Sequence, residues 1–190
     1  MPGIAFILGN GRSRASIMLN QLSGKGLIVG CNALYRDFTP DILIATDLPI
    51  SEEIQKSGYA LKHEFWTRKP LNDKGARKLE KPYYGMSSGP AAASRACLRG
   101  CTIIYLIGFD LGSPTKFVNN IYAGSLHYKK EQDGTTYYGN WVTQLQLLAD
   151  RFENVKFIRV MGKESTVMDF KRKNIEIIDL NDFQTRINKL

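Results

Sequence analysis

The sequence has no long apolar run and few cysteines, and both shortages exclude classes of protein. No stretch approaches the roughly 18 uninterrupted apolar residues that a membrane helix needs. Met1-Pro2-Gly3 leads into an apolar run without a basic leader, so we expect a cytoplasmic protein that is not secreted. The three cysteines, Cys31, Cys97 and Cys101, have no C-x-x-C spacing, which argues against a disulfide framework or a zinc site.

Several nucleotide and nucleic-acid motifs are also missing. There is no G-x-x-x-x-G-K-[ST] motif, so a Walker-type triphosphate hydrolase is not expected. The loop Gly9-Asn10-Gly11 lacks the third glycine of the dinucleotide fingerprint, because Arg14 stands there, and Asn32 replaces the acidic residue that holds a ribose. No RNA-binding signature or zinc finger occurs, which makes nucleic acid an unexpected partner.

Length and charge define what remains. With 43% apolar side chains, 190 residues can bury one full core, so we expect a single domain over residues 1–190 and leave a homo-oligomer open. The net charge is +8, and six of the eight surplus charges lie in residues 60–100. This segment either attracts an anionic acceptor or a membrane surface, or is simply a solvated face.

Short apolar and β-branched runs alternate with helical patterns along most of the chain, which is typical of strands joined by helical crossovers. The sequence therefore predicts an α/β fold with a single doubly wound, largely parallel, Rossmann-like sheet and helices on both faces. Residues 111–138 show neither period, and a loop of this length is typical of a lid. The patterns predict strands at 4–8, 27–29, 41–45, 59–66, 102–107, 155–160 and 175–178, and helices at 13–22, 49–56, 90–98, 140–151 and from 182.

Ligands of such folds bind beyond the carboxyl ends of the strands. Gly9-Asn10-Gly11 follows the first strand and opens a helix, so its N–H groups are expected to face an anion such as phosphate. Arg12 and Ser13 add hydrogen-bond donors beside it. An ordinary tight turn is the alternative interpretation.

Four further positions follow strands or precede a helix. Asn32 presents a donor and an acceptor, and Asp47 and Asp110 present carboxylates that suit a sugar hydroxyl or a ribose. Ser87-Ser88-Gly89 precedes a helix of small residues and offers a second place for an anion. Turn formation or helix capping explains Asn32, Asp47 and Ser88 equally well.

The 111–138 loop supplies the remaining candidates. Asn120 and Tyr122 offer polar groups to a ligand, and His127 is the candidate base near neutral pH. No cluster has metal-ligand character, so we expect transfer from a nucleotide leaving group without an obligatory cofactor. For His127, an ordinary surface position is the alternative.

The order of these blocks resembles a known group of proteins, the bacterial sialyltransferase-like family. It also resembles a related domain family that includes archaeal 6-hydroxymethylpterin pyrophosphokinases and motility-associated flagellin glycosylation factors. The resemblance covers residues 4–112 and rests on Gly9-Asn10-Gly11 with Ser13, Cys31-Asn32, Ser87-Ser88-Gly89 and the run from Ile104 to Asp110.

The resemblance implies a site for a CMP-sugar or another nucleotide. The glycine loop and Asn32 would contact phosphates and ribose, the serine–glycine turn would border the base or sugar, and Asp110 would line the ribose. Two positions depart from the family: Arg12 stands where a proline is usual, and Gly112 where an aromatic residue holds the phosphate. Tyr122 would then supply the missing hydroxyl.

The leading interpretation is a glycosyltransferase-like enzyme that uses a nucleotide-activated sugar, with His127 as base. Two alternatives stay open. One is a pyrophosphokinase or related phosphoryl-transfer enzyme that needs Mg²⁺, with Asp47 or Asp110 as ligands. The other is a non-catalytic nucleotide-binding protein.

Overall fold

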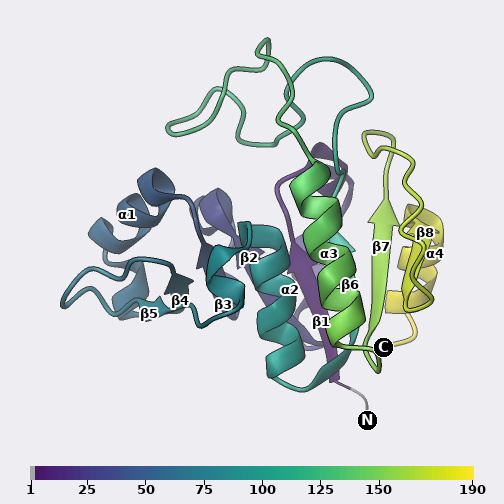
Figure 1. Cartoon of the computed structure of the whole chain (residues 1–190), viewed down its shortest axis with the longest axis horizontal. Helices are drawn as coiled ribbons and strands as arrows, with labels where there is room; N and C mark the ends of the chain where they lie inside the picture. The colour runs from purple at the N-terminus through teal and green to yellow at the C-terminus, as the bar shows by residue number, and fades with distance from the viewer. Residues whose placement is uncertain (1–2) are drawn as a thin grey trace.

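The computed structural model describes residues 3–190, and its centre is one sheet of eight parallel strands (Figure 1). The strand order is β5-β4-β3-β2-β1-β6-β7-β8, as expected for a doubly wound sheet. Met1 and Pro2, on which the prediction of a leader-free start depends, lie outside the described residues. The strands are β1 (Gly3–Leu8), β2 (Leu27–Cys31), β3 (Ile42–Ala45), β4 (Glu64–Thr67), β5 (Arg77–Lys78), β6 (Cys101–Ile107), β7 (Lys156–Met161) and β8 (Ile175–Asp179).

Helices cover both faces of the sheet, which confirms the predicted fold class. Helices α2 and α3 lie side by side on one face (Figure 1). The α-helices are α1 (Leu48–Lys56), α2 (Ser88–Leu98), α3 (Gly139–Arg151) and α4 (Leu180–Ile187), and the 3₁₀ helices are η1 (Arg12–Ser16), η2 (Leu19–Leu22), η3 (Asn32–Arg36), η4 (Tyr59–Leu61) and η5 (Tyr83–Gly85).

The two-residue period of the central strands separates the cores on the two faces. In β1, Ala5 and Ile7 join the core under α2 and α3, whereas Phe6 and Leu8 join the opposite core with α1 and α4. The alanines that follow Pro90 are fully buried, so small residues allow α2 to pack close to the sheet. Strands buried on both faces read as continuous apolar runs, which is why β1 and β6 were predictable.

Strand order reverses between β1 and β6. From β1 the chain moves outward through β2 to β5, and it then returns to place β6 on the other side of β1. Their carboxyl ends therefore open a crevice at a switch point, where ligands of open α/β sheets bind.

Three local predictions are wrong. Residues 13–22 form η1 and η2 instead of one helix, because Arg14 turns inward to donate to the Gly9 carbonyl and the chain is extended at Ile17. Residues 59–66 divide into η4 and β4. The third concerns Ser88, which begins α2 instead of capping it.

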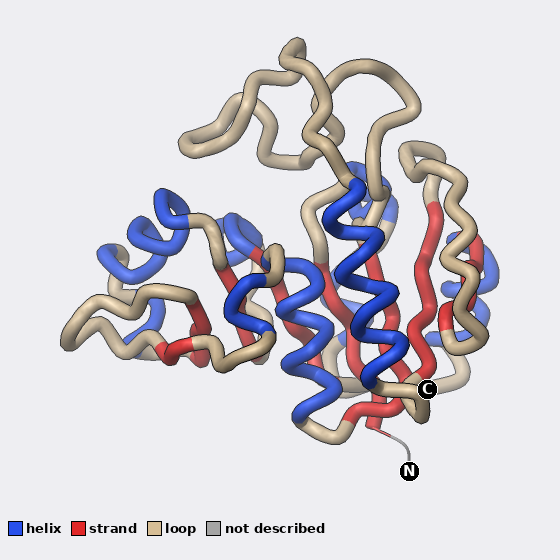
Figure 2. The backbone as a smooth tube through the Cα atoms, viewed as in Figure 1, coloured by secondary structure: helices blue, strands red, loops and turns tan. Residues whose placement is uncertain are grey.

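Residues 111–138, all within the described part of the chain, contain no helix or strand, as predicted. Figure 2 shows this loop rising beyond the carboxyl ends of the strands. One isolated bridge joins Phe117 to Gly134. No helix within residues 3–190 has the length and apolar character needed to cross a membrane.

Candidate functional site

A cavity of about 380 Å³ lies at the switch point, between the strand ends and the 111–138 loop. The order of the strands explains its position, since β1, β2, β3 and β6 all end at this edge. The structure brings ten of the predicted site residues to its lining: Gly9, Asn10, Gly11, Asn32, Asp47, Ser87, Ser88, Gly89, Asp110 and Asn120.

The glycine loop packs directly against the end of β6. The N–H groups of Gly9 and Gly11 donate to the carbonyl oxygens of Ile107 and Gly108, at 2.8 and 2.9 Å. A Cβ atom on Gly9 would lie 2.7 Å from the Gly108 oxygen, and one on Gly11 would lie 2.6 Å from it. Only glycine permits this close approach.

Four N–H groups in the loop and just after it are bonded within the protein. Besides Gly9 and Gly11, the N–H of Arg12 donates to Asn119 Oδ1 at 3.1 Å, and that of Ser13 to Asp110 Oδ2 at 3.1 Å. Because one N–H makes one good hydrogen bond, these four groups are already used within the protein, and a phosphate contact of the loop stays a prediction. The loop forms a tightly held wall of the cavity.

Asp110 anchors three strand ends to one another. Asp110 is only 3% exposed. Its carboxylate accepts hydrogen bonds from the Ser13 N–H, at 3.1 Å, and from the Ser165 hydroxyl, at 2.7 Å. Fully buried Arg159 on β7 donates to the carbonyl oxygens of Phe109 and Asp110, at 2.8 and 2.9 Å. Burial lowers the pKa of Arg159 to about 10, against the opposing effect of the Asp110 charge. Each oxygen of the carboxylate predicted to bind a ribose thus already accepts one hydrogen bond from the protein.

A relay of hydrogen bonds orients the Asn32 side chain. The Thr46 N–H donates to Ser88 Oγ at 3.0 Å, and the Ser88 hydroxyl donates to Asn32 Oδ1 at 2.8 Å. With its oxygen turned to Ser88, Asn32 offers its amide N–H groups to the cavity. The backbone of Asn32 is left-handed, with φ of 53°, a conformation that asparagine tolerates better than most residues.

Asp47 differs from Asp110 in having an exposed carboxylate. It occupies the N-cap position of α1, yet its side chain makes no capping hydrogen bond. The helix begins with Pro49 in its first turn, which needs no N–H partner. Capping therefore does not account for Asp47, and its carboxylate lines the cavity.

Three predicted ligand-binding residues lie outside this lining. Arg12 pairs with Glu131 of the 111–138 loop at 2.8 Å, and Ser13 is buried against Asp110. The hydroxyl of buried Tyr122 accepts from Arg14 at 3.0 Å, so Tyr122 does not supply a phosphate contact in this structure. These contacts hold the loop on the glycine turn.

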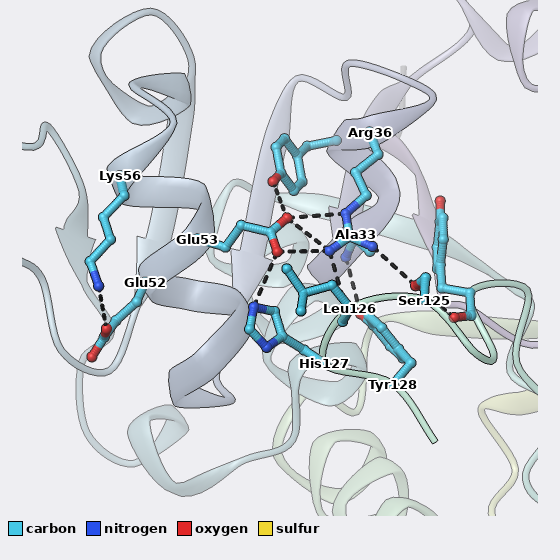
Figure 3. Close-up of polar contacts among 11 residues, drawn as sticks. Ala33, Arg36, Glu52, Glu53, Lys56, Ser125, Leu126, His127 and Tyr128 are labelled. Carbon is cyan, nitrogen blue, oxygen red and sulfur yellow. Dashed lines mark hydrogen bonds and ion pairs between the residues drawn. The ribbon is translucent and has the colours of Figure 1, made fainter. Parts of the chain in front are cut away.

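His127 also lies outside the lining, in a cluster with Glu53 of α1 and Tyr35 and Arg36 of η3, here called the docking cluster (Figure 3). Its Nε2 is 3.1 Å from Glu53 Oε2, and Glu53 also accepts two hydrogen bonds at 2.8 Å from Nη2 of Arg36, and one from the Tyr35 hydroxyl. Burial raises the pKa of Glu53, but the hydrogen bonds from Tyr35 and Arg36 outweigh it and hold that pKa below its ordinary value. The structure therefore gives His127 a place in holding the loop, and does not bring it to the cavity as a base.

Two helix N-termini converge on the cavity. Ser88, Gly89 and Pro90 of α2 line it, as do Asn140 and Trp141 of α3. The first N–H groups of a helix have no partner within it, and the helix dipole adds partial positive charge there. In the part of the chain that the structure describes, no group of three or more histidine, cysteine, aspartate or glutamate side chains could hold a metal ion. The two helix N-termini favour an anion held by backbone donors.

Among the lining residues that sequence reasoning missed, four lie together at the end of the loop and the start of α3: Thr136, Tyr137, Asn140 and Trp141. They occupy the end of the irregular loop and the first turn of α3. The aromatic and amide side chains immediately before a predicted helix, beside a predicted lid, were the available signal. No spacing motif marks them.

The chain matches known proteins by its structure and not by its sequence. No protein-family model matches the chain, and no curated protein matches it by sequence. It is similar to the monofunctional alpha-2,3-sialyltransferase Cst-I from Campylobacter jejuni, with 13% identity and a TM-score of 0.59 over 99% of this chain and 94% of that chain.

Two structures of the sialyltransferase CstII are also similar. The C. jejuni enzyme in complex with cytidine-5'-monophosphate has 13% identity and a TM-score of 0.55 over 90% of this chain and 87% of that chain. CstII with a trisaccharide acceptor and CMP has 12% identity and a TM-score of 0.52 over 98% and 99%. These similarities support the sialyltransferase side of the resemblance and not the pterin pyrophosphokinase side. The chain therefore has a sialyltransferase-like fold.

Proposed function

We propose that this chain is a glycosyltransferase-like enzyme that takes a nucleotide-activated sugar, a CMP-sugar in the first instance, into the switch-point cavity. The observation that carries the proposal is the convergence of two helix N-termini and the Asn32 amide on one cavity. Such donors suit the phosphate of a nucleotide leaving group and stabilise the charge that develops on it. Structures with the same fold that hold CMP add support.

In this proposal the phosphate lies between the start of α2 and the Asn32 amide. The 111–138 loop is a lid, and residues 1–190 act as one nucleotide-binding unit. The loop is held to the glycine turn by the Arg12–Glu131 ion pair and by the Ile121 N–H, which donates to the Asn10 carbonyl at 2.9 Å. A closed lid would exclude water from an activated sugar.

Asp47 is the candidate base in place of His127. Among the described lining residues it carries the one exposed carboxylate, whereas the Asp110 carboxylate is buried and bonded. A positioned carboxylate that accepts the proton of an acceptor hydroxyl contributes about 10²–10⁴-fold to the rate. The magnesium-dependent alternative gains no support from a specific contact.

A thermal-shift screen tests nucleotide binding. The ligands are CMP, UDP, GDP and AMP, each with and without Mg²⁺. A ligand present at about 100 times its Kd adds roughly 2.7 kcal/mol to the stability. We expect a metal-independent shift that Asn32→Ala abolishes and Asn20→Ala, an exposed control in η2, retains. No shift with any nucleotide would contradict the proposal, and a shift only with Mg²⁺ would favour phosphoryl transfer.

Asp47→Asn separates an enzyme from a binding protein. Release of nucleotide from its sugar conjugate is followed with and without added oligosaccharides. We expect the variant to bind the nucleotide as the wild type does while its turnover falls about 10²-fold or more. Equal turnover in both proteins would remove Asp47 as the base, and no turnover in the wild type would support the non-catalytic alternative.

A further inference from the structure

Two aromatic side chains that line the cavity carry a more specific inference, which rests on the proposed function because it concerns the same cavity. Tyr137 lines the cavity and is 74% exposed, whereas most of a tyrosine ring is normally buried in a folded protein. A Cβ atom on Gly139 would collide with the Tyr137 hydroxyl and ring. The ring therefore lies over the first residue of α3, where glycine makes room for it.

Trp141 stands beside it in the first turn of α3. It lines the same cavity and is half-buried, and its backbone N–H donates to the Tyr138 carbonyl oxygen at 3.0 Å. That bond ties the tryptophan to the segment that carries Tyr137. Two aromatic side chains thus enter the lining from the start of α3 and the residues before it, whereas the polar donors come from Asn32 and the start of α2.

The amides near these rings divide into used and available ones. Asn119 donates to the carbonyl oxygens of Gly112 and Glu164, and its own oxygen accepts from Arg12. Asn140, in contrast, is exposed in the first turn of α3 and lines the cavity next to Trp141. An exposed amide presents both a donor and an acceptor to the edge of a planar ring.

We infer that Tyr137 and Trp141 form the subsite for the nucleobase, with Asn140 at the edge of the base. A nucleobase is a flat π-system, and any of the bases can stack on an aromatic side chain because each of them has a π-face. The aromatic pair therefore fixes the orientation of the nucleotide: the phosphate lies toward the start of α2 and the base toward the start of α3.

The test compares ligands that do and do not carry a base. The probes are CMP, UMP, GMP, AMP and ribose 5-phosphate. The chain has two tryptophans, so Trp66→Phe leaves Trp141 as the sole indole. Trp66 lies away from the cavity, with the Arg95 guanidinium 3.7 Å from its ring centre. We expect at least one of the four nucleotides to quench Trp141 fluorescence, and ribose 5-phosphate to leave it unchanged.

Variants of Tyr137 complete the test by calorimetry. Tyr137→Ala should weaken binding of the preferred nucleotide about 5- to 150-fold, the value of one stacked base, and leave ribose 5-phosphate unaffected. Tyr137→Phe should retain the nucleotide affinity because the ring is kept. Phe117→Ala, an exposed aromatic of the same loop outside this cavity, is the matched control.

Each other result decides against the inference. Equal losses for nucleotide and ribose 5-phosphate, or an unchanged nucleotide affinity in Tyr137→Ala, would remove the base from this subsite. A loss in Tyr137→Phe as large as in Tyr137→Ala would show that the hydroxyl binds and not the ring. If no nucleotide binds the wild-type protein, the proposed function itself fails; if one binds and these variants do not matter, only the base subsite fails.

Discussion

The two walls of the cavity are built in opposite ways. The strand-end wall consists of Gly9–Gly11 and Gly108–Asp110, and its polar groups are largely bonded to the protein itself. The loop-side wall consists of Thr136, Tyr137, Asn140 and Trp141, and most of its side chains are exposed. One wall is a fixed frame, and the other presents its side chains to a ligand.

This difference indicates that the residues of the sequence motifs hold the fold together more than they contact a ligand. The residues that stand out by motif, such as Gly11 and Asp110, mainly hold β1, β6 and β7 together at the switch point. We expect their replacement to affect stability first. Replacement of loop-side residues should instead affect ligand affinity and leave the fold intact, and the predictions below test that division.

The largest effect is expected for Asp110→Asn. The change removes the negative charge beside fully buried Arg159 and weakens the acceptor for Ser13 and Ser165. Leaving a buried donor without its acceptor costs about 1–3 kcal/mol, and more where a charged group is involved, which should appear as a lower midpoint in urea unfolding. Asp73→Asn, an exposed aspartate, serves as the charge control. Equal stability of the two variants would show that Asp110 is not an anchor.

Gly11→Ala should come next. The added Cβ would meet the Asp110 carboxylate and lie 2.6 Å from the Gly108 carbonyl oxygen, and overpacking of this kind costs about 1–3 kcal/mol. A Cβ on Gly85 has no neighbour within 4 Å, so Gly85→Ala is the control. A thermal melt that places both variants at the wild-type Tm would contradict the close packing of the strand-end wall.

Ser88→Ala tests the relay that joins the frame to the ligand. The loss of the hydroxyl leaves the buried Thr46 N–H without its acceptor and releases Asn32 Oδ1, at a cost of about 1–3 kcal/mol. Nucleotide affinity should fall as well, since the Asn32 amide loses its orientation. Ser94→Ala is matched to it, because Ser94 lies on the same helix and bonds only to Ala91. If the two variants have equal affinity, the relay has no part in binding.

The smallest effect on global stability, about 1 kcal/mol, is expected for Glu53→Gln at the partly exposed docking cluster. Because the pKa of folded Glu53 lies below its ordinary value of 4.5, the ionised carboxylate stabilises the docked loop above that pH. This contribution is lost as the pH falls below 4.5 through the lower folded pKa. Hydrogen exchange of residues 123–130 at pH 7 should rise in the variant, and the difference should disappear in acid. Glu52→Gln is the neighbouring control, and equal exchange at pH 7 would remove Glu53 as the docking point.

The sequence predicted the sheet better than the site. Continuous apolar runs such as Thr102–Ile107 determine buried strands by composition alone. The two-residue strand β5 and the break of residues 13–22 into η1 and η2 depend on tertiary contacts, among them those of Arg14 with Gly9 and Tyr122. Such contacts leave no pattern in the local sequence, so neither feature could be predicted from it.

Asn32 and Asp47 were chosen because each follows a strand, and both line the cavity. Position after a strand could not show that the glycine-loop N–H groups and Asp110 are used by the protein, because their partners lie about a hundred residues away in the chain. The position of His127 was likewise unpredictable, since it depends on how a long irregular loop docks on α1.

Chemical-shift mapping of the ¹⁵N-labelled protein tests the central claim most directly. The ligand is the nucleotide that gives the largest thermal shift, added to saturation. The account predicts large changes at the amides of Gly89, Tyr137 and Asn140 and at the Trp141 indole, with smaller changes at Gly11 and Asp110. Changes confined to residues 60–86 of the basic segment 60–100, with the cavity residues unaffected, would contradict a nucleotide site at the switch point.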